Sequence, residues 1–358
     1  MKGRVLIAGF ATRHVAQSSH NAGYEVCAVD HFCDQDLAWC TTDREKFDEL
    51  NDLPDAVDRI AKRHRFDFFV ATSGAEDLPT TIPLAGTPRD RIALFLDKLD
   101  TQHFFEECTV PVPPLAGHGE FPVMVKPRRG AGGWRNAVIH DEQGIAHWEA
   151  LYPDVPYIRQ QCVPGHPASV CCVTNGKDAR AIATNEQILR GSGESAYGFS
   201  GSVTPFAHPQ AGPMIACAEK IAASSGCYGT IGIDFMVNDN NVWTIEVNPR
   251  FQGTTETVER ATGCNLFDLH MNACNGTLPA SMPAPVRVAA RSILFADRDL
   301  TMAADLSALK VFVSDIPWPG TFFEEGQALV SVSADGVTRN DALALLDKHI
   351  TTVRQYMR

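Results

Sequence analysis

The sequence has 358 residues, of which 44% are hydrophobic and 21% are charged. This is the composition of an ordinary globular protein that is long enough for two or three domains. The net charge of −12 argues against a nucleic-acid partner, which would require a basic face, and no apolar run is long enough to span a bilayer. Eleven cysteines are scattered without a Cys-x-x-Cys pair, which favours free thiols in a reducing cytoplasm over a zinc site.

The first part of the chain predicts a parallel sheet with helices between its strands. Arg4–Ala8 and Tyr24–Val29 are apolar runs joined by a helical stretch, and Phe66–Ala71 is a third such run after a helix at Pro54–His64. A full Gly-x-Gly-x-x-Gly motif is absent, so a dinucleotide site is not supported. Asp30, after the second strand, is better suited to capping the loop that follows than to holding a ribose.

A polar loop follows the third of these strands. Loops beyond the carboxyl ends of parallel strands are where open α/β sheets bind ligands. Glu76 in this loop is therefore a candidate substrate contact. An acidic side chain near the start of a helix is an equally good interpretation, because carboxylates stabilise helix N-termini.

A glycine-rich hairpin follows a predicted helix at Arg91–Cys108. Phe121–Val125 forms a strand that ends at Lys126, and Ala137–Ile139 begins the next strand. The loop between them contains Gly130, Ala131, Gly132 and Gly133. Glycines let backbone N–H groups approach an anion without side-chain clash. With Lys126 at its base to neutralise charge, this loop predicts a phosphate site.

The stretch Gly229–Thr255 predicts a second hairpin that carries acidic groups. Two extended runs meet at a turn, so Asp234 and Glu246 are expected side by side at the strand ends. Asn248 shares the face of Glu246, and two carboxylates with an amide oxygen suit Mg²⁺. Arg250 continues that face and offers a planar cation to a phosphate or carboxylate.

Candidate substrate contacts follow this hairpin. Gly253 and Thr254 begin a helix, and backbone N–H groups at such a start can face a carboxylate or acyl phosphate. Arg291 lies on the predicted strand Val286–Phe295 and is a candidate for binding a substrate carboxylate. An ordinary ion-paired strand arginine is at least as good an interpretation of Arg291.

Several of these motifs resemble the ATP-grasp superfamily. Glu246-Val247-Asn248-Pro249-Arg250 is similar to the Glu-x-Asn-Pro-Arg that ends its metal-binding strands, and the glycine-rich hairpin is similar to its flap. Asp97-Lys98 before the proline-rich Val110–Pro114 resembles its phosphate-binding helix, which implies that Lys98 reaches ATP phosphates. Tyr157–Val163 resembles its hinge, and the resemblance places Gln161, Cys162 and Val163 at adenine. His166 stands where an acid often holds the ribose, so that contact departs from the family.

The resemblance covers about residues 1–299 and implies a mixed α/β fold in three parts. Residues 1–95 would form a pre-ATP-grasp domain with a parallel sheet. Residues 96–190 would form the amino-terminal ATP-grasp lobe with its small flap domain. Residues 191–358 would complete the nucleotide-binding core and end in a segment like that of biotin carboxylases, with a strand at Glu325–Val332 and a helix at Thr338–Val353.

The implied activity is that of a cytoplasmic carboxylate–amine ligase in the branch that also contains biotin carboxylases. ATP would phosphorylate a small-molecule carboxylate, and an amine would then displace phosphate, with Mg²⁺ or Mn²⁺ as the metal. Asp234, Glu246 and Asn248 would hold the metal. The catalytic residues would be Lys126, Asn248 and Arg250. The resemblance also allows assembly as a homodimer.

Four alternatives remain beside this ligase. A biotin-dependent carboxylase would carry a glutamate where this chain has Thr254, and a carbamoyl-phosphate synthase would carry a second arginine where it has Gly253. A nucleotide-binding regulatory protein could keep the fold without turnover. A Rossmann-type oxidoreductase would bind a nicotinamide cofactor instead of ATP.

Overall fold

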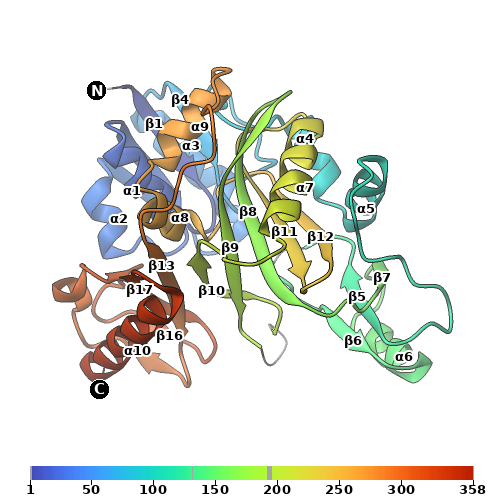
Figure 1. The fold of residues 1–358 in the computed structure, drawn as a ribbon. Helices are drawn as coiled ribbons and strands as arrows, with labels where there is room; N and C mark the ends of the chain where they lie inside the picture. The colour runs from blue at the N-terminus through green and yellow to red at the C-terminus, as the bar shows by residue number, and fades with distance from the viewer. Residues whose placement is uncertain (1, 131, 192–195, 358) are drawn as a thin grey trace.

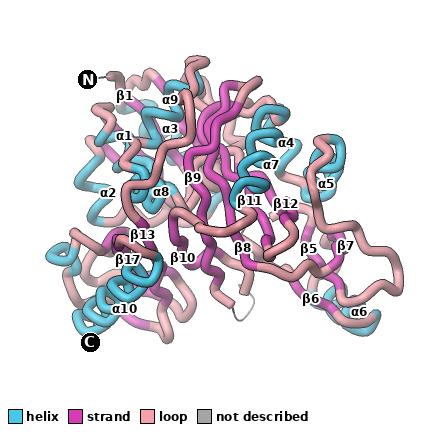
Figure 2. Tube along the Cα trace, in the orientation of Figure 1, coloured by secondary structure: helices cyan, strands magenta, loops and turns pink. Residues whose placement is uncertain are grey.

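The computed structural model describes residues 2–130, 132–191 and 196–357 (Figure 1). It contains a parallel four-stranded sheet near the N-terminus, a small three-stranded antiparallel sheet and an eight-stranded antiparallel sheet. A two-stranded ribbon lies in the C-terminal region. Figure 2 shows the large sheet in the middle of the molecule, with the other units on either side of it. The mixed α/β class predicted from the sequence is confirmed.

The N-terminal sheet has the order β3 (Asp43–Lys46), β2 (Glu25–Asp30), β1 (Arg4–Ala8) and β4 (Phe68–Ala71), with all strands parallel. Its helices are α1 (Arg13–Asn21), α2 (Gln35–Cys40) and α3 (Leu53–Arg63), and a short 3₁₀ turn spans Leu50–Asp52. Successive side chains of β1 point to opposite faces of the sheet. Leu6 therefore packs in the hydrophobic core that contains α3, and Ile7 packs in the core that contains α1. Asp30 accepts hydrogen bonds from the backbone N–H groups of Thr12, Phe32 and Cys33, which is the capping role predicted for it.

The small sheet has the order β6 (Ala137–Ile139), β5 (Val123–Pro127) and β7 (Tyr157–Gln161), and α6 (Glu142–Leu151) packs against it. Two helices precede it, α4 (Arg89–Phe95) and α5 (Lys98–Glu107), where the sequence predicted one helix at Arg91–Cys108. The helix breaks because the Asp97 carboxylate caps α5, accepting from the Leu99 N–H at 2.9 Å. The same carboxylate pairs with Arg128, so the helix start is tied to the glycine-rich hairpin.

The large sheet holds most of the remaining chain. Its strands, in spatial order, are β12 (Val242–Asn248), β11 (Tyr228–Val237), β8 (His166–Asn175), β9 (Ala179–Leu189), β10 (Phe199–Thr204), β13 (Val288–Phe295), β17 (Ala328–Gly336) and β15 (Val313–Ser314). The helices α7 (Ala211–Ser224), α8 (Thr255–Thr262) and α9 (Leu266–Cys274) cover it. Cys172 packs in the core with α7, whereas Cys171 packs in the core with α8 and α9. Both faces of the sheet are therefore buried, which holds the ends of its strands in place.

The C-terminal region packs a long helix on the far end of this sheet. The helix α10 (Arg339–Tyr356) begins at the Thr338 cap and runs beyond the predicted end at Val353. The strand predicted at Glu325–Val332 is shifted to Ala328–Gly336. Smaller elements are the ribbon of β14 (Leu300–Thr301) and β16 (Phe322–Phe323) and a 3₁₀ turn at Leu306–Leu309. Figure 1 shows this region below the N-terminal sheet, which brings the two ends of the chain to the same side of the molecule.

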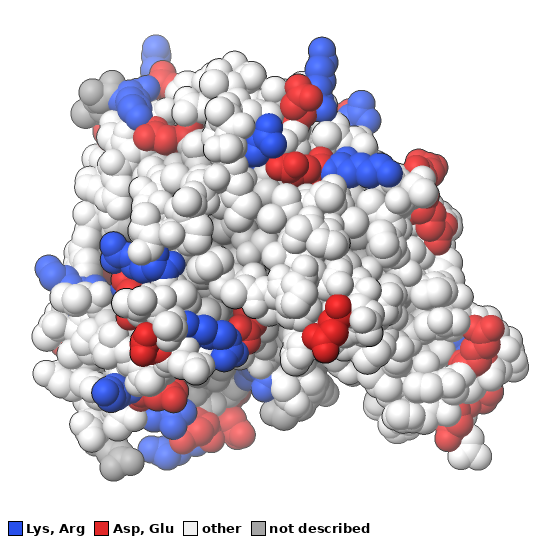
Figure 3. All heavy atoms as spheres, in the orientation of Figure 1, with Lys and Arg blue, Asp and Glu red and all other residues white. Residues whose placement is uncertain are grey.

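Two further sequence expectations concern the surface and the cysteines. Figure 3 shows Lys and Arg side chains interspersed with Asp and Glu on the face in view. None of the helices that the structure describes is long and apolar enough to cross a membrane. All eleven cysteines are free thiols, as their spacing predicted.

Candidate active site between the two antiparallel sheets

A cavity of about 350 Å³ lies between the three-stranded and eight-stranded sheets. Its apolar lining combines side chains of both sheets and of the link between them, namely Met124, Val138, Val163, Leu189, Met236 and Ile245. Its charged lining consists of Lys98, Lys126, Asp234 and Glu246. An apolar slot with a few convergent polar groups is the usual form of a small-molecule site.

The acidic groups face each other across the β11–β12 hairpin. Asp234 and Glu246 are direct partners in the antiparallel register, and Ile245 is an extra residue that forms a bulge beside them. The Asp234 carboxylate accepts hydrogen bonds from Gln187 Nε2 at 2.8 Å and from Asn248 Nδ2 at 3.1 Å. Burial raises the pKa of Asp234 to about 7, and the neighbouring Glu246 charge adds to the shift. Two carboxylates held this close together favour a bound cation.

Arg250 belongs to a chain of hydrogen bonds that extends from the Asp234–Glu246 pair. Its Nη2 donates to Asn248 Oδ1 at 3.1 Å and its Nε donates to Glu76 Oε1 at 2.6 Å. Glu76 also accepts the Gly74 N–H at 2.6 Å. Because no helix begins in this loop, the alternative of a helix-stabilising acid is wrong. Glu76 instead joins the loop after β4 to the acidic hairpin, and its role as a substrate contact remains a prediction.

The amide of Asn248 is turned toward protein partners. Its nitrogen faces Asp234 and its oxygen faces Arg250. For the oxygen to reach a metal ion held by Asp234, the amide would have to rotate. Asn248 therefore joins the carboxylate pair to Arg250 in this structure, and metal ligation by its oxygen remains a prediction.

The cationic side of the cavity is built by Lys126 and Lys98. Lys126 is 9% exposed, and burial lowers its pKa to about 8, while the Glu246 charge opposes that shift. Lys98 is the first residue of α5, and its Nζ donates to the Gly130 carbonyl at 2.7 Å. Both lysines thus approach the cavity from the base of the glycine-rich loop, where an anion would stabilise their charges.

The glycine-rich loop needs its glycines for conformation and for close contact. Gly132 and Gly133 both have φ of +69°, a region that favours glycine. A Cβ on Gly133 would lie 2.7 Å from the Cβ of Tyr197, so the loop approaches the segment before β10. Gly130 and Gly133 line the cavity, and Ala131, also predicted there, lies outside the described residues.

Some residues of the predicted hinge line the cavity, and one lies at the surface. Gln161, Cys162 and Val163 line the cavity, although Gln161 is largely exposed. His166 begins β8, is exposed and pairs with Val237. It is not among the described residues that line the cavity, so the structure gives no support to a ribose contact there.

Of the remaining predicted substrate residues, Gly253 and Arg291 line a neighbouring chamber. Arg291 is buried, donates to Asp315 Oδ2 at 2.7 Å and reaches the Gly253 carbonyl at 3.2 Å. It is therefore an ion-paired arginine, as the alternative interpretation held. Thr254 is a buried residue at the start of α8, and a Cβ on Gly253 would lie 2.9 Å from the Phe199 ring.

Some cavity residues were left out of the sequence-based site. The sequence left open whether Asn185, Glu186 and Gln187 face a nucleotide or solvent; Gln187 shares a face of β9 with Leu189, and both line the cavity. Met124 and Val138 line it as well, and the alternation of β5 places Met124 on the face of Lys126. The signal was present in the period-two pattern, but which face of each strand turns inward depends on the packing of two sheets.

The donor set fits a magnesium ion that also binds phosphate oxygens. Among the described residues no group of three His, Cys, Asp or Glu side chains could hold a metal alone. Two carboxylates leave most of an octahedron to water and phosphate, which is the usual protein environment of Mg²⁺. The apolar slot of the cavity is suited to a flat ring such as a nucleobase.

Comparison with known proteins identifies this arrangement. Residues 95–254 match the family model of an ATP-grasp domain. This segment of the chain is an ATP-grasp domain. The matched segment contains the glycine-rich loop, both lysines and the acidic hairpin, so the cavity lies within the ATP-grasp domain.

Two sequence relatives match different shares of this chain. The carbamoyl phosphate synthase large chain of Thermomicrobium roseum is 26% identical over 207 residues, covering 52% of this chain and 19% of that protein. This chain thus spans about a fifth of the length of that relative. An uncharacterized protein of Methanocaldococcus jannaschii is 24% identical over 363 residues, covering 92% of this chain and 88% of its own.

Solved structures share the ATP-grasp fold at low identity. A biotin carboxylase of Campylobacter jejuni superposes with a TM-score of 0.77 at 15% identity, covering 97% of this chain and 90% of that one. An N5-carboxyaminoimidazole synthetase of Staphylococcus aureus complexed with ADP gives 0.75 at 15% identity, covering 98% and 97%. An L-amino acid ligase of Bacillus licheniformis gives 0.69 at 15% identity, covering 97% of both chains. The predicted ATP-grasp fold is confirmed.

Proposed function

We propose that this ATP-grasp protein is a magnesium-dependent ligase that activates a carboxylate as an acyl phosphate and joins it to an amine. The observation that carries the proposal is the charged side of the cavity, where Lys126 lies near the Asp234–Glu246 pair. A triphosphate needs both cations and a carboxylate-held metal. The apolar slot beside them supports binding of the adenine ring.

Each group has a distinct task in the proposal. Lys98, Lys126 and the backbone N–H groups of the glycine-rich loop bind the phosphates. Asp234 and Glu246 hold Mg²⁺, which would neutralise charge on the phosphate oxygens. Arg250, held by Asn248 and Glu76, is fixed in orientation to stabilise the transferring phosphoryl group.

The proposed reaction has two balanced steps. A substrate carboxylate oxygen attacks the γ-phosphorus of ATP, the bond to the β-phosphate oxygen breaks, and ADP leaves with an acyl phosphate remaining. The nitrogen of an amine then attacks the acyl carbon. Phosphate leaves and the nitrogen loses a proton, so the products are an amide, ADP and phosphate. The chain's contribution is positioning and exclusion of water, because the acyl phosphate would otherwise hydrolyse.

The carboxylating alternatives have less support from the residues present. Position 254 is a threonine, so it supplies no base for bicarbonate. The nearest acid along the chain is Glu256, which is paired with Arg13 at 2.9 Å and with Arg291 at 3.6 Å. Gly253 cannot replace the second arginine of a carbamoyl-phosphate synthase. These features favour an amine acceptor.

The test combines Mg·ATP with pools of carboxylic acids and hydroxylamine, which converts an acyl phosphate into a hydroxamate. We expect carboxylate-dependent ADP release with hydroxamate formation, and neither product from a Glu246→Gln variant. ADP release that depends on bicarbonate alone would replace the proposal with a carboxylating enzyme. Nucleotide binding without ADP release from any pool would replace it with a regulatory protein that lacks turnover.

A further inference from the structure

A second groove opens between the N-terminal sheet and the C-terminal region. It consists of an inner chamber of about 240 Å³ and an outer chamber of about 650 Å³. Phe10, Phe32, Asp34, Phe323 and Ala328 line both chambers. The shared walls make the two chambers one continuous groove, which we call the aromatic groove.

Aromatic side chains form the outer chamber. The rings of Phe10 and His31 are stacked with centroids 4.6 Å apart, and Phe32 meets Phe10 edge-on. Trp318 and Phe322 line the same chamber and are 46% and 58% exposed. Aromatic surface that is gathered in a hollow and left in water favours a ligand with a flat apolar body.

A carboxylate without a partner lies where the two chambers meet. Within the described part of the chain, the Asp34 side chain accepts no hydrogen bond and forms no ion pair. Burial raises its pKa to about 8, and the charges of Asp315, Asp30 and Asp36 add to the shift. His14 lines the chamber too, and its Nε2 is buried without a hydrogen-bond partner among the described residues. The inner chamber therefore has a carboxylate acceptor and a neutral imidazole available to a ligand.

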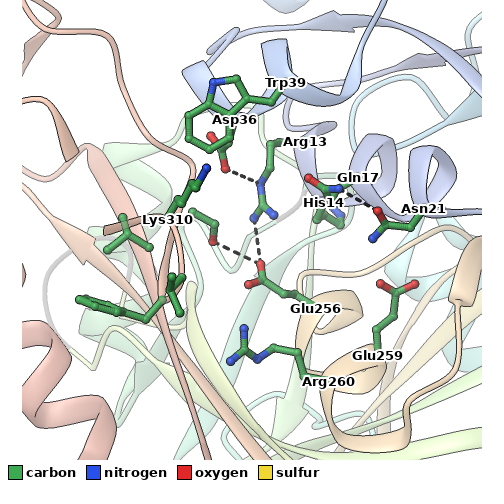
Figure 4. A pocket seen from close by; sticks show the side chains of 14 residues that line it. Arg13, His14, Gln17, Asn21, Asp36, Trp39, Glu256, Glu259, Arg260 and Lys310 are labelled. Atoms are coloured by element: carbon green, nitrogen blue, oxygen red, sulfur yellow. Dashed lines mark hydrogen bonds and ion pairs between the residues drawn. The ribbon is translucent and has the colours of Figure 1, made fainter. Parts of the chain in front are cut away.

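The two arginines that line this chamber, Arg13 and Arg291, are paired with carboxylates other than Asp34. Figure 4 shows Arg13 between Asp36 and Glu256, and a third carboxylate, Asp315, lies 2.8 Å from its Nε. Arg291 is held by Asp315 and Glu256. Three carboxylates thus surround two arginines, and Asp34 would add a fourth negative charge when it ionises. A cationic ligand group would compensate it.

The mouth of the groove has the opposite charge. Arg44 and Lys46 on β3 line the outer chamber. Arg44 forms no ion pair among the described residues, and Lys46 has only Asp48 at 3.7 Å. Alternation along β3 sends the acidic Glu45 to the other side, where it pairs with Arg59 and Arg63. The two cations are thus left facing the groove.

The groove adjoins the nucleotide cavity. Phe199 and Gly253 line the inner chamber, and a Cβ on Gly253 would clash with the Phe199 ring. Tyr197, two residues before Phe199, lines the nucleotide cavity, and Gly253 follows Arg250 by three residues. The two sites are therefore lined by neighbouring residues of the same segment, Tyr197 and Phe199.

We propose that the aromatic groove binds the amine substrate, and that this substrate is an arylalkyl amine with an anionic group on its ring. The ammonium group binds Asp34, the ring packs among Phe10, Trp318 and Phe322, and the anion faces Arg44 and Lys46. Assigning this ligand as the acceptor rests on the proposed ligase function. The binding itself does not.

The test is calorimetric titration of the full chain, without nucleotide, with 4-(aminomethyl)benzoate as the probe. Three analogues each remove one feature: benzylamine lacks the anion, 4-methylbenzoate lacks the amine, and trans-4-(aminomethyl)cyclohexanecarboxylate lacks the aromatic ring. We expect each analogue to bind at least about tenfold more weakly, since each loses one set of contacts. No binding of the probe, or equal binding of all four compounds, would overturn the proposal.

Variants locate the probe in the groove. Asp34→Asn should weaken 4-(aminomethyl)benzoate about tenfold but leave 4-methylbenzoate unchanged, and Phe322→Ala should weaken both. Trp39→Ala is the matched control, because Trp39 is 48% exposed but lines a different pocket; it should alter neither. Unchanged probe binding in Asp34→Asn would refute the site. The titration needs no ATP, so the two proposals can fail separately. If the probe binds as described but the protein has no ligase activity, only the proposed function is refuted. If the protein is an active ligase but the probe does not bind in this way, only the groove is refuted.

Discussion

A Glu246→Gln variant is expected to lose Mg·ATP-dependent ADP formation by roughly two to three orders of magnitude while it remains folded. Glu246 is half-buried opposite Asp234 in the hairpin register. Glutamine keeps the shape but removes one of the two carboxylates that would hold magnesium. It also removes one cause of the raised pKa of Asp234, so the remaining carboxylate ionises more readily but faces the metal alone.

The measurement is steady-state ADP release with each acid pool, accompanied by thermal unfolding to verify the fold. Asp239→Asn is the matched control, because Asp239 lies at the tip of the same hairpin with its side chain 93% exposed. It should retain the activity of the parent protein. Near-normal turnover of Glu246→Gln would refute the metal assignment, and equal losses in both variants would point to damage of the hairpin.

A Lys126→Ala variant is expected to bind ATP roughly 10- to 100-fold more weakly, since charge-assisted bonds to phosphate are worth about 1.5 to 3 kcal/mol. Lys126 is buried at the base of the glycine-rich loop. Exposed Lys177, in the turn between β8 and β9, is the control, and Lys177→Ala should leave the affinity unchanged. Titration calorimetry of ATP into each variant measures the effect, and unchanged affinity of Lys126→Ala would remove the phosphate role of the loop base.

Proton uptake gives the same titration a second readout. Because burial lowers the pKa of Lys126 to about 8, most of this side chain is neutral at pH 9 in the free protein. A bound triphosphate favours the ammonium form, so binding at pH 9 should take up a proton. Titrations in two buffers with different ionisation enthalpies report that proton. The uptake should be absent at pH 6 and absent in Lys126→Ala.

The parts of the fold and site that were predictable depend on local pattern. The alternation on both sides of the Asn238–Asn241 turn was sufficient to predict a hairpin, and its register does bring Asp234 opposite Glu246. Three glycines after a strand that ends in Lys126 indicated the loop for the same reason. In both cases residues near one another in sequence determine the geometry.

The features that were not predictable depend on partners that are distant in sequence. Nothing near Arg291 in the chain indicates that Asp315 and Ser331 occupy its donors, so its availability could not be inferred. The Asn248 oxygen accepts a hydrogen bond from Arg250 in this structure, a contact that the sequence did not indicate, and its metal ligation remains a prediction. The break before α5 was visible only in retrospect, as an aspartate at the cap position.

The aromatic groove is the clearest example of such long-range assembly. Its walls come from Phe10 and Phe32 after the first two strands and from Trp318 and Phe322 about 290 residues later. Each aromatic residue alone has the pattern of an ordinary surface residue. Only the packing of the C-terminal region against the N-terminal sheet brings them together.

The position of the metal tests the central claim most directly. We predict that a crystal of this protein with Mn²⁺ and a non-hydrolysable ATP analogue will show an anomalous peak about 2.0 to 2.3 Å from carboxylate oxygens of both Asp234 and Glu246. The phosphates should lie between that peak and Lys126. A manganese peak bound elsewhere, or a nucleotide outside the cavity between the two antiparallel sheets, would contradict the account.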